Sequence, residues 1–336
     1  MLKKYPFVIA EMSGNHNQSL DNALRIVDAA AKSGVDAIKL QTYTADTISI
    51  RGVHKINNQE SLWYGKDLFD LYDEAHTPWE WHPAIFERAR ELGIICFSSP
   101  FDETAVDLLE SLGSPIYKIA SFEINHIPLL RKVASTNKPV IMSIGASSLS
   151  EIEEAVDTLR AFGCGELTLL KCTSAYPALH SDANLLTIPH LKNLFNCEVG
   201  LSDHTKGIAS PIVAVGLGAM CIEKHLCLDR KEKGVDSEFS LEPEEFEILV
   251  REVRNAHDSI GVINYGLIDS EKKGDAGKRS IYVSSYIKSG EKISKENIKI
   301  VRPGYGLHPR YFDEVIGKIA LTDMSPGEKL KFDKLK

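Results

Sequence analysis

Short apolar runs recur eight times along this chain, and amphipathic segments with helical periodicity lie between them. The apolar runs are Phe7–Met12, Ala37–Thr42, Ile94–Ser99, Ile116–Ser121, Pro139–Ile144, Leu167–Cys172, Glu198–Asp203 and Met220–His225. The helical segments include Asp21–Ser33, Pro78–Leu92, Thr104–Leu112, Ser150–Phe162 and Glu242–Ile260. Eight such units within about 260 residues predict an α/β chain that folds as a (β/α)8 barrel, the TIM barrel.

A doubly wound sheet is the main alternative for strands that alternate with helices. That fold usually carries a glycine-rich dinucleotide-binding loop after its first strand, whereas Glu11 is followed here by Met-Ser-Gly-Asn-His. Polar residues end nearly every apolar run, which favours the barrel because barrel active sites form at the C-terminal ends of the strands. These residues include Glu11, Lys39, Gln41, Ser99, Lys118, Ser121, Ser143, Ser174, Ser202, Asp203, His204, Glu223 and His225.

The pattern changes after the eighth helical segment, so we expect a second domain. We assign residues 1–263 to the barrel, the polar and glycine-containing residues 264–278 to a linker, and residues 279–336 to a small β-rich domain. Within that domain Ile287-Lys-Ser-Gly-Glu-Lys-Ile resembles Met324-Ser-Pro-Gly-Glu-Lys-Leu. This echo predicts two hairpin-forming turns, but it is too short to indicate a repeat protein.

Composition narrows the functional classes. A formal net charge of -8 argues against a nucleic-acid-binding face, which needs clustered lysines and arginines, but it permits an anionic small substrate in a lysine-lined cleft. No apolar run is long enough to cross a bilayer, and the first residues do not resemble a signal peptide. The six cysteines form no Cys-x-x-Cys pair and fit free thiols. We therefore expect a cytoplasmic protein.

Two histidines close the last two predicted strands. His204 and His225 could both offer imidazole nitrogens to one divalent cation, with carboxylates or substrate oxygens completing the shell. The alternative is that each histidine only hydrogen-bonds a loop. Because both close a barrel strand, beside Asp203 and Glu223 respectively, we favour the metal site.

Two lysines interrupt strands that should otherwise be apolar. Burying Lys39 and Lys118 is costly unless each ammonium meets a fixed anion. One alternative is an internal salt bridge with Glu11 or Glu123, and another is a Schiff-base lysine. Two lysines near several serine hydroxyls favour a phosphate or carboxylate cradle over either alternative.

Other residues near the strand ends suggest roles in proton transfer and substrate enclosure. Glu11 or Glu123 could handle a proton or activate water, although either could be a solvated carboxylate at the rim. The long polar connection after the second strand contains Trp63 and Tyr64, and connections of that length often form lids or binding loops. Trp79 and Trp81 are expected to pack at a helix start.

Several stretches together resemble the sialic acid synthase family over nearly the whole chain. They are Ile9–His16, Ala37–Thr42, Ser98–Phe101, Tyr117–Glu123, Lys171–Pro177, Gly200–Thr205 and Ile222–His225, and Val301–Gly306 is similar to the family's antifreeze-like (SAF) domain. The resemblance implies a transferase that condenses phosphoenolpyruvate (PEP) with an N-acetylated amino sugar. A metal-polarised aldehyde is attacked by C3 of PEP, water adds at C2, and phosphate leaves by C–O cleavage.

The resemblance also implies the residue roles. It assigns PEP to Lys39, Ser99, Lys118, Ser121, Ser174 and Ser202, the sugar to Glu11, Gln41, Tyr176 and Asp236, and a divalent metal, Mn2+ or Mg2+, to His204 and His225. Arg302 is expected to reach the partner's active site in a domain-swapped homodimer. Several relatives carry asparagine where this chain has Ser174, whose side chain is shorter.

Two stretches and the tail are most similar to the pseudaminic acid synthases within this family. They are Leu62–Tyr64, Leu68–His82 and Gly306–Pro309. The implied sugar is then 2,4-diacetamido-2,4,6-trideoxy-L-altrose and the product is pseudaminic acid. Synthesis of N-acetylneuraminate or legionaminate from another sugar is the alternative, and a non-catalytic sugar-binding barrel is a third.

Overall fold

The computed structural model describes residues 5–59, 61–271 and 277–336 of the chain. The chain divides into two compact units, Met1–Gly261 and Val262–Lys336, which are described separately below. The predicted linker, 264–278, includes residues 272–276, which lie outside the described residues. Among the described residues, no helix is long and apolar enough to span a membrane.

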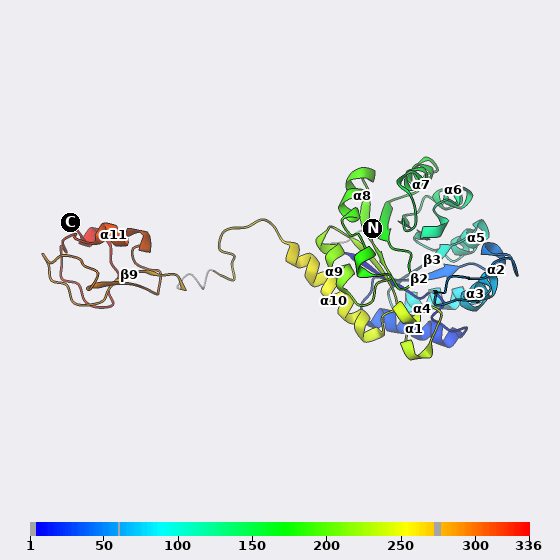
Figure 1. Cartoon of the computed structure of the whole chain (residues 1–336), viewed down its shortest axis with the longest axis horizontal. Coiled ribbons are helices and arrows are strands. Elements are labelled where there is room, and N and C mark those ends of the chain that lie inside the picture. Colours follow the sequence, from blue (N-terminus) through cyan, green and yellow to red (C-terminus); the bar gives the residue numbers. More distant parts are fainter. Residues whose placement is uncertain (1–4, 60, 272–276) are drawn as a thin grey trace. The chain divides into compact units, whose positions relative to one another are not determined.

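The first unit is a closed barrel of eight parallel strands in sequential order (Figure 1). The strands are β1 (Phe7–Glu11), β2 (Ala37–Thr42), β3 (Ile95–Pro100), β4 (Tyr117–Ile119), β5 (Val140–Ser143), β6 (Leu167–Cys172), β7 (Glu198–Asp203) and β8 (Cys221–His225). All eight predicted strands are confirmed. Strand β4 ends earlier than expected, because Ser121 already begins a 3-10 turn.

Helices surround these strands (Figure 1). They are α1 (Leu20–Lys32), α2 (Ala45–Ile48), α3 (Leu68–Ala75), α4 (His82–Glu91), α5 (Glu103–Ser111), α6 (Ile127–Ala134), α7 (Leu149–Ala161), α8 (Thr187–Phe195), α9 (Ala209–Gly216) and α10 (Pro243–Ile260). Local capping explains their starts: Ser148 forms a capping box with Glu151 at α7, and Pro243 occupies the first turn of α10. The predicted helix Pro78–Leu92 is divided into a 3-10 turn, Trp79–Trp81, and α4.

The barrel interior changes from apolar to polar along the strands. An apolar cluster fills the interior on the side nearer the N-terminal ends of the strands. It consists of Phe7, Ile9, Ala37, Phe97, Ile116, Ile141, Leu170 and Cys221. Two residues further along, the same strand faces carry Glu11, Lys39, Ser99, Lys118, Ser143, Cys172 and Glu223. The apolar layer therefore supports a polar layer at the C-terminal ends of the strands.

Gly200 allows two strands to approach each other within this interior. A Cβ atom on Gly200 would lie 2.1 Å from the carbonyl oxygen of Cys221 and 2.7 Å from Leu170 Cδ2. Only glycine fits here without moving the backbone of β8. The position matters because β7 and β8 are the two strands that carry the histidines.

The second unit contains an antiparallel pair, β9 (Ser280–Val283) and β10 (Ile298–Val301), and a short helix, α11 (Phe312–Val315). The two echo segments form equivalent turns: Gly290 and Gly327 both have φ of 86°, and Glu291 and Glu328 each accept a backbone N–H three residues earlier. The segments do not close separate hairpins, because Ile287 pairs with Met324.

Candidate active site

Two buried lysines flank one carboxylate in the polar layer. Lys39 Nζ lies 3.6 Å from Glu223 Oε2, and Lys118 Nζ lies 3.5 Å from Glu223 Oε1. Ser202 Oγ donates to Glu223 Oε1 at 3.0 Å. Although burial opposes ionisation, Lys118 and then Lys39 hold the pKa of Glu223 below its usual value. Glu223 is thus a fixed anion that joins β2, β4, β7 and β8.

Lys39 also contacts Glu11, and together they connect the polar layer to β1. Lys39 Nζ lies 2.7 Å from Glu11 Oε2, and Lys39 donates to Ser99 Oγ at 3.3 Å. Burial raises the pKa of Glu11, although Lys39 opposes the rise. The two ammonium groups therefore lie near one carboxylate that is held ionised, Glu223, and near another, Glu11, that is more easily protonated. This arrangement of charges suits an incoming anion.

The alternative that the two lysines form internal salt bridges with Glu11 or Glu123 is therefore partly correct. Lys39 pairs with Glu11 as that alternative expected, but Lys118 pairs with Glu223 and not with Glu123. Burial, opposed by Lys118, raises the pKa of Glu123 to about 7, and Glu123 Oε2 has no hydrogen-bond partner among the described residues. Both lysines still line a cavity, so the internal pairs do not close off the proposed cradle.

A chain of hydrogen bonds runs from Glu11 to Asp236. Gln41 Nε2 donates to Glu11 Oε1 at 2.9 Å and to Ser13 Oγ at 3.0 Å, and Ser13 Oγ donates in turn to Asp236 Oδ2. Asp236 Oδ2 lies 3.7 Å from His225 Nδ1. These hydrogen bonds connect the predicted sugar-binding residues Glu11, Gln41 and Asp236 on one side of the site.

His204 and His225 face each other with ring centroids 5.3 Å apart. If His204 Nδ1 donates to the carbonyl oxygen of Thr173, 3.0 Å away, its Nε2 lone pair is free for a ligand. Burial is the largest cause of a pKa of His225 that lies well below its usual value, and this shift favours the neutral imidazole that a metal ligand requires. Its buried Nδ1 has no hydrogen-bond partner among the described residues.

This geometry fits a divalent cation held by two imidazoles. Within the described ranges, no group of three or more His, Cys, Asp or Glu side chains gathers to hold a metal. If a divalent cation binds here, His204 and His225 would offer it two imidazole nitrogens, and substrate or water oxygens would complete the shell.

Gly145 leaves space beside the hydroxyls of Ser121 and Ser174. A Cβ atom at Gly145 would lie 2.3 Å from Ser174 Oγ and 2.9 Å from Ser121 Oγ. Ser121 Oγ accepts from the Gly145 N–H at 3.0 Å. The backbone after β5 therefore packs directly against two of the predicted PEP-binding serines.

A cavity of about 310 Å³ adjoins the polar layer at the C-terminal ends of the strands. The predicted site residues that line it are Lys39, Gln41, Lys118, Ser121, Glu123, Tyr176, Ser202, His204, His225 and Asp236. Glu11 and Ser99 lie behind Lys39 and contact its ammonium group, and Ser174 adjoins Cys172 of the lining. Arg302 is an exposed residue of the second unit.

Aromatic side chains cover one side of this cavity. The Tyr176 ring lies 4.6 Å from that of His204 and 5.9 Å from that of Trp63. Trp63 Nε1 donates to the carbonyl oxygen of Val235 at 3.2 Å, which joins the connection after β2 to the connection after β8. Trp79 and Trp81 do pack before a helix, as expected, and Tyr64 is exposed.

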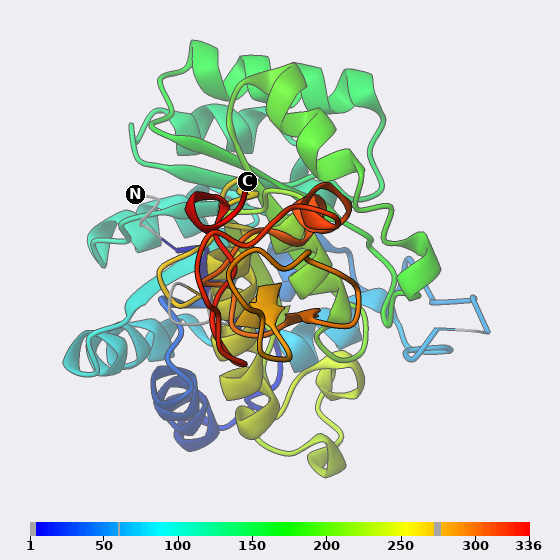
Figure 2. The ribbon, with the colours of Figure 1, turned by 90° about the vertical axis from the view of Figure 1, so that its left-hand side faces the viewer.

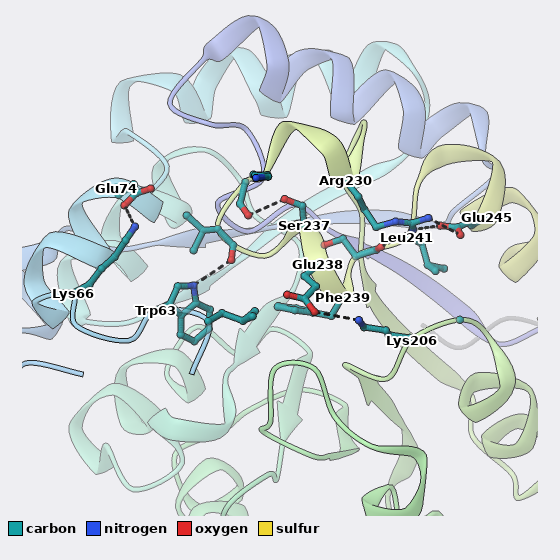
Figure 3. Close-up of a pocket in the computed structure, with 16 residues that line it drawn as sticks. Trp63, Lys66, Glu74, Lys206, Arg230, Ser237, Glu238, Phe239, Leu241 and Glu245 are labelled. Atoms are coloured by element: carbon teal, nitrogen blue, oxygen red, sulfur yellow. Dashed lines mark hydrogen bonds and ion pairs between the residues drawn. The ribbon is translucent and has the colours of Figure 1, made fainter. Parts of the chain in front are cut away.

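A second pocket of about 790 Å³ lies on the other side of this contact, where the close-up in Figure 3 shows it. Six of its charged side chains form ion pairs, Lys66 with Glu74, Lys206 with Glu238 and Arg230 with Glu245, and Lys233 lines the pocket as well. Trp63 and Val235 line both cavities. The Trp63–Val235 hydrogen bond is therefore part of the wall between them.

Comparison with known proteins places this geometry in a family. The model of the NeuB family matches residues 26–265, and that of the SAF domain matches residues 278–336. The chain belongs to the NeuB family. It therefore combines a NeuB-family TIM barrel with a SAF domain, as the resemblance implied.

Full-length relatives include named synthases. The chain is 44% identical to the pseudaminic acid synthase of Campylobacter jejuni serotype O:23/36 over 98% of this chain and 96% of that one. It is 40% identical to the pseudaminic acid synthase of Helicobacter pylori, with 98% and 97% covered. The crystal structure of N-acetylneuraminic acid synthetase from Leptospira borgpetersenii superposes with a TM-score of 0.72 at 35% identity, covering 81% of this chain and 90% of that one. This NeuB-family chain is accordingly an enzyme, a transferase.

The site of this NeuB-family member contains residues that the predicted set omits. Glu223 holds both lysines, Ser13 joins Gln41 to Asp236, and Ser143 lines the cavity. Glu223 and Ser143 were both placed among the polar strand ends by the sequence, and Glu223 beside His225, but neither was given a role. Ser13 carried no such signal: it follows β1 with φ of 48°, and its contacts depend on the fold of distant segments.

Proposed function

We propose that this chain condenses PEP with 2,4-diacetamido-2,4,6-trideoxy-L-altrose to give pseudaminic acid and phosphate. The observation that carries the proposal is the convergence of two buried ammonium groups and two imidazoles on one cavity, from β2, β4, β7 and β8. The sugar is supported by the 44% identity to a pseudaminic acid synthase, against 35% to an N-acetylneuraminic acid synthetase. The retained lysines and histidines argue against a non-catalytic barrel.

The lysines provide the binding site for PEP in this proposal. Lys39 and Lys118 hold its phosphate and carboxylate groups, and the hydroxyls of Ser121 and Ser202 orient them. Glu223 keeps the two ammonium groups at fixed positions. Ser99 and Ser174 act from the edge of this cradle, since Ser99 contacts Lys39 and Ser174 adjoins Cys172.

Bond formation takes place between the lysines and the histidines. When bound to His204 and His225, a divalent cation, Mn2+ or Mg2+, supplies the Lewis acidity that polarises the sugar aldehyde. Gln41, Tyr176 and Asp236 orient the sugar so that C3 of PEP reaches the carbonyl carbon. Glu123 or Glu11 then takes a proton from the water that adds at C2, and the aldehyde oxygen takes up a proton to become a hydroxyl. Phosphate leaves by cleavage of the bond between C2 and its bridging oxygen as the C2 carbonyl forms.

We further propose that the enzyme is a domain-swapped homodimer in which Arg302 completes the sugar site of the partner subunit. This part rests on the similarity of the Val301–Gly306 stretch to the SAF domain and on the exposure of the Arg302 side chain. A guanidinium group suits hydrogen bonding to sugar hydroxyl and amide oxygens.

Phosphate release with PEP and Mn2+ tests the proposed function. We expect turnover with the diacetamido trideoxy altrose and little with N-acetylmannosamine. Turnover with N-acetylmannosamine alone would assign the chain to N-acetylneuraminate synthesis, and turnover only with the legionaminate precursor would assign it to that sibling activity. A His204→Ala variant that kept full, chelator-resistant turnover would refute the metal role.

A further inference from the structure

The cavity has a second, apolar wall that the residues of the proposed mechanism do not use. It faces the same space as the lysines and histidines and is supplied by the connection between β2 and β3. Its aliphatic members are Ile48 at the end of α2, Ile56 in the α2–α3 connection, and Leu68, Leu71 and Ala75 on α3. We call this group the aliphatic wall.

Helix α3 presents one face to the cavity. Leu68, Leu71, Tyr72 and Ala75 follow the i, i+3, i+4, i+7 spacing of a single helical stripe, and all four line the cavity. The start of the helix is fixed by Asp67, whose carboxylate accepts from the Phe69 N–H at 3.0 Å. The apolar stripe is therefore built into a capped helix.

The α2–α3 connection, light blue in Figure 2, extends from the barrel. Backbone hydrogen bonds within this connection hold Ile56. The Ile56 N–H donates to the carbonyl oxygen of Lys66 at 3.0 Å, and its own carbonyl accepts from Gly65 at 2.8 Å. Trp63 from the same connection is bonded to Val235. These contacts hold Ile56 and Trp63 in the lining of the cavity.

Tyrosines complete this side of the cavity. Tyr43 makes edge-to-face contacts with Tyr72 at 5.8 Å and with Phe101 at 5.0 Å, measured between ring centroids. All three rings line the cavity. Phenol groups offer an apolar ring and one hydroxyl, so they can contact both the methyl and the amide of an acetamido group.

Such a wall discriminates between methyl and hydroxyl groups on a sugar. Burying a methyl group against aliphatic side chains is favourable by about 0.8 kcal/mol per carbon. A hydroxyl turned toward the same side chains loses its hydrogen bonds to water without replacement, which costs about 1–3 kcal/mol. The polar layer has no corresponding preference, because charged and hydroxyl groups dominate it.

We propose that the aliphatic wall selects acceptor sugars that are deoxygenated and acetamido-substituted at the end remote from the reacting carbonyl. The carbonyl would lie at the histidines, and the deoxy and acetamido methyl groups would lie against Ile48, Ile56 and Leu68. This inference rests on the proposed function and assigns its sugar specificity to residues with no catalytic role.

Isoleucine-to-threonine variants test the wall because they keep the branch at Cβ while they shorten the side chain by one methyl and add a hydroxyl. Ile48→Thr and Ile56→Thr place a hydroxyl on the wall, whereas Ile50→Thr makes the same change at a side chain that is 70% exposed and does not line the cavity. We measure kcat/KM for the diacetamido trideoxy altrose and for N-acetylmannosamine, together with KM for PEP.

The two wall variants should lower the preference for the deoxy sugar by roughly threefold to tenfold, with KM for PEP unchanged. Ile50→Thr should keep the wild-type preference. An unchanged preference in both wall variants would overturn the inference, as would an equal change in Ile50→Thr.

Saturation-transfer NMR of each sugar in the presence of the enzyme gives a readout that does not need turnover. The deoxy and acetamido methyl protons should receive the strongest saturation from the wild-type enzyme and less from Ile48→Thr. If these signals appear but no phosphate is released with PEP, the proposed function fails and the wall stands. If phosphate is released while the methyl protons stay unsaturated, the function stands and the wall fails.

Discussion

Lys224 donates from its buried ammonium group to Asp203 Oδ2 at 2.5 Å, and this bond joins the ends of the two histidine-bearing strands. The same ammonium donates to the carbonyl oxygen of Thr205 at 2.5 Å. Asp203 and Thr205 flank His204, and Lys224 itself precedes His225. One side chain on the outer face of β8 thus fixes the spacing of both imidazoles.

We predict that Lys224→Met weakens Mn2+ binding about tenfold or more, because the residues that orient His204 lose their anchor. It should also lower the melting temperature, since Asp203 is left as an unpaired buried charge. Titration calorimetry with Mn2+ measures the affinity, with the exposed Lys192→Met as control. A folded Lys224→Met protein with wild-type Mn2+ affinity would contradict this role.

Glu223→Gln should shift the alkaline limb of PEP binding. Burial lowers the pKa of Lys118, and the Glu223 charge opposes that effect. Without this charge, Lys118 loses its proton at a lower pH and no longer attracts the phosphate. We expect kcat/KM for PEP to fall at a lower pH in the variant than in the wild type. Identical alkaline limbs would show that Glu223 does not support Lys118.

Glu123→Gln should stabilise the protein increasingly as the pH rises above about 4.5, with the full effect above about pH 7. The folded-state pKa of Glu123 is raised to about 7 by burial, so its stabilising contribution is complete below the unfolded value of 4.5 and is lost as the pH rises through about 7. Glutamine cannot ionise and avoids that loss. The variant should match the wild type near pH 4.5 and exceed it by up to roughly 3 kcal/mol above pH 8, measured by urea unfolding.

Glu154→Gln, on the exposed face of α7, should show no such pH-dependent difference. If Glu123 also activates water, kcat of Glu123→Gln should fall by about a hundredfold or more. Equal stability differences at both pH values would place the Glu123 carboxyl in a solvated environment instead.

Gly145→Ala should raise KM for PEP by roughly tenfold, because the new Cβ displaces the hydroxyls of Ser174 and Ser121. Gly216→Ala in α9 is the matched control, since its Cβ would meet no atom within 4 Å. Steady-state kinetics at saturating sugar give both values. A wild-type KM in Gly145→Ala would exclude these hydroxyls from the phosphate site.

Complementation between inactive subunits tests the swapped dimer. Arg302→Ala and His225→Ala should each be inactive as homodimers. Mixed after unfolding and refolding together, they should recover roughly a quarter of the wild-type activity, because half of the dimers are then mixed and each has one complete site. No recovery in confirmed mixed dimers would show that Arg302 serves its own barrel.

The eight strands could be predicted because each is a short apolar run with a polar end, a pattern that needs only neighbouring residues. The same pattern located Lys39, Lys118, His204 and His225 at one end of the barrel. Contacts between distant segments were harder to predict. The Lys118–Glu223 pair and the bond from Ser13 to Asp236 depend on strand register and on loops that return from the far side of the barrel.

The sequence by itself determined which side chains face the barrel interior, because alternation along a strand is a local property. The apolar stripe of α3 is local as well, through the helical spacing of Leu68, Leu71 and Ala75, although only a long connection was predicted there. Only the tertiary structure decided what these groups face. Closure of the barrel placed Glu223 between two lysines, and the return of the α2–α3 connection set an aliphatic wall opposite two imidazoles. Contacts of that kind form only when the whole barrel closes, so no local pattern encodes them.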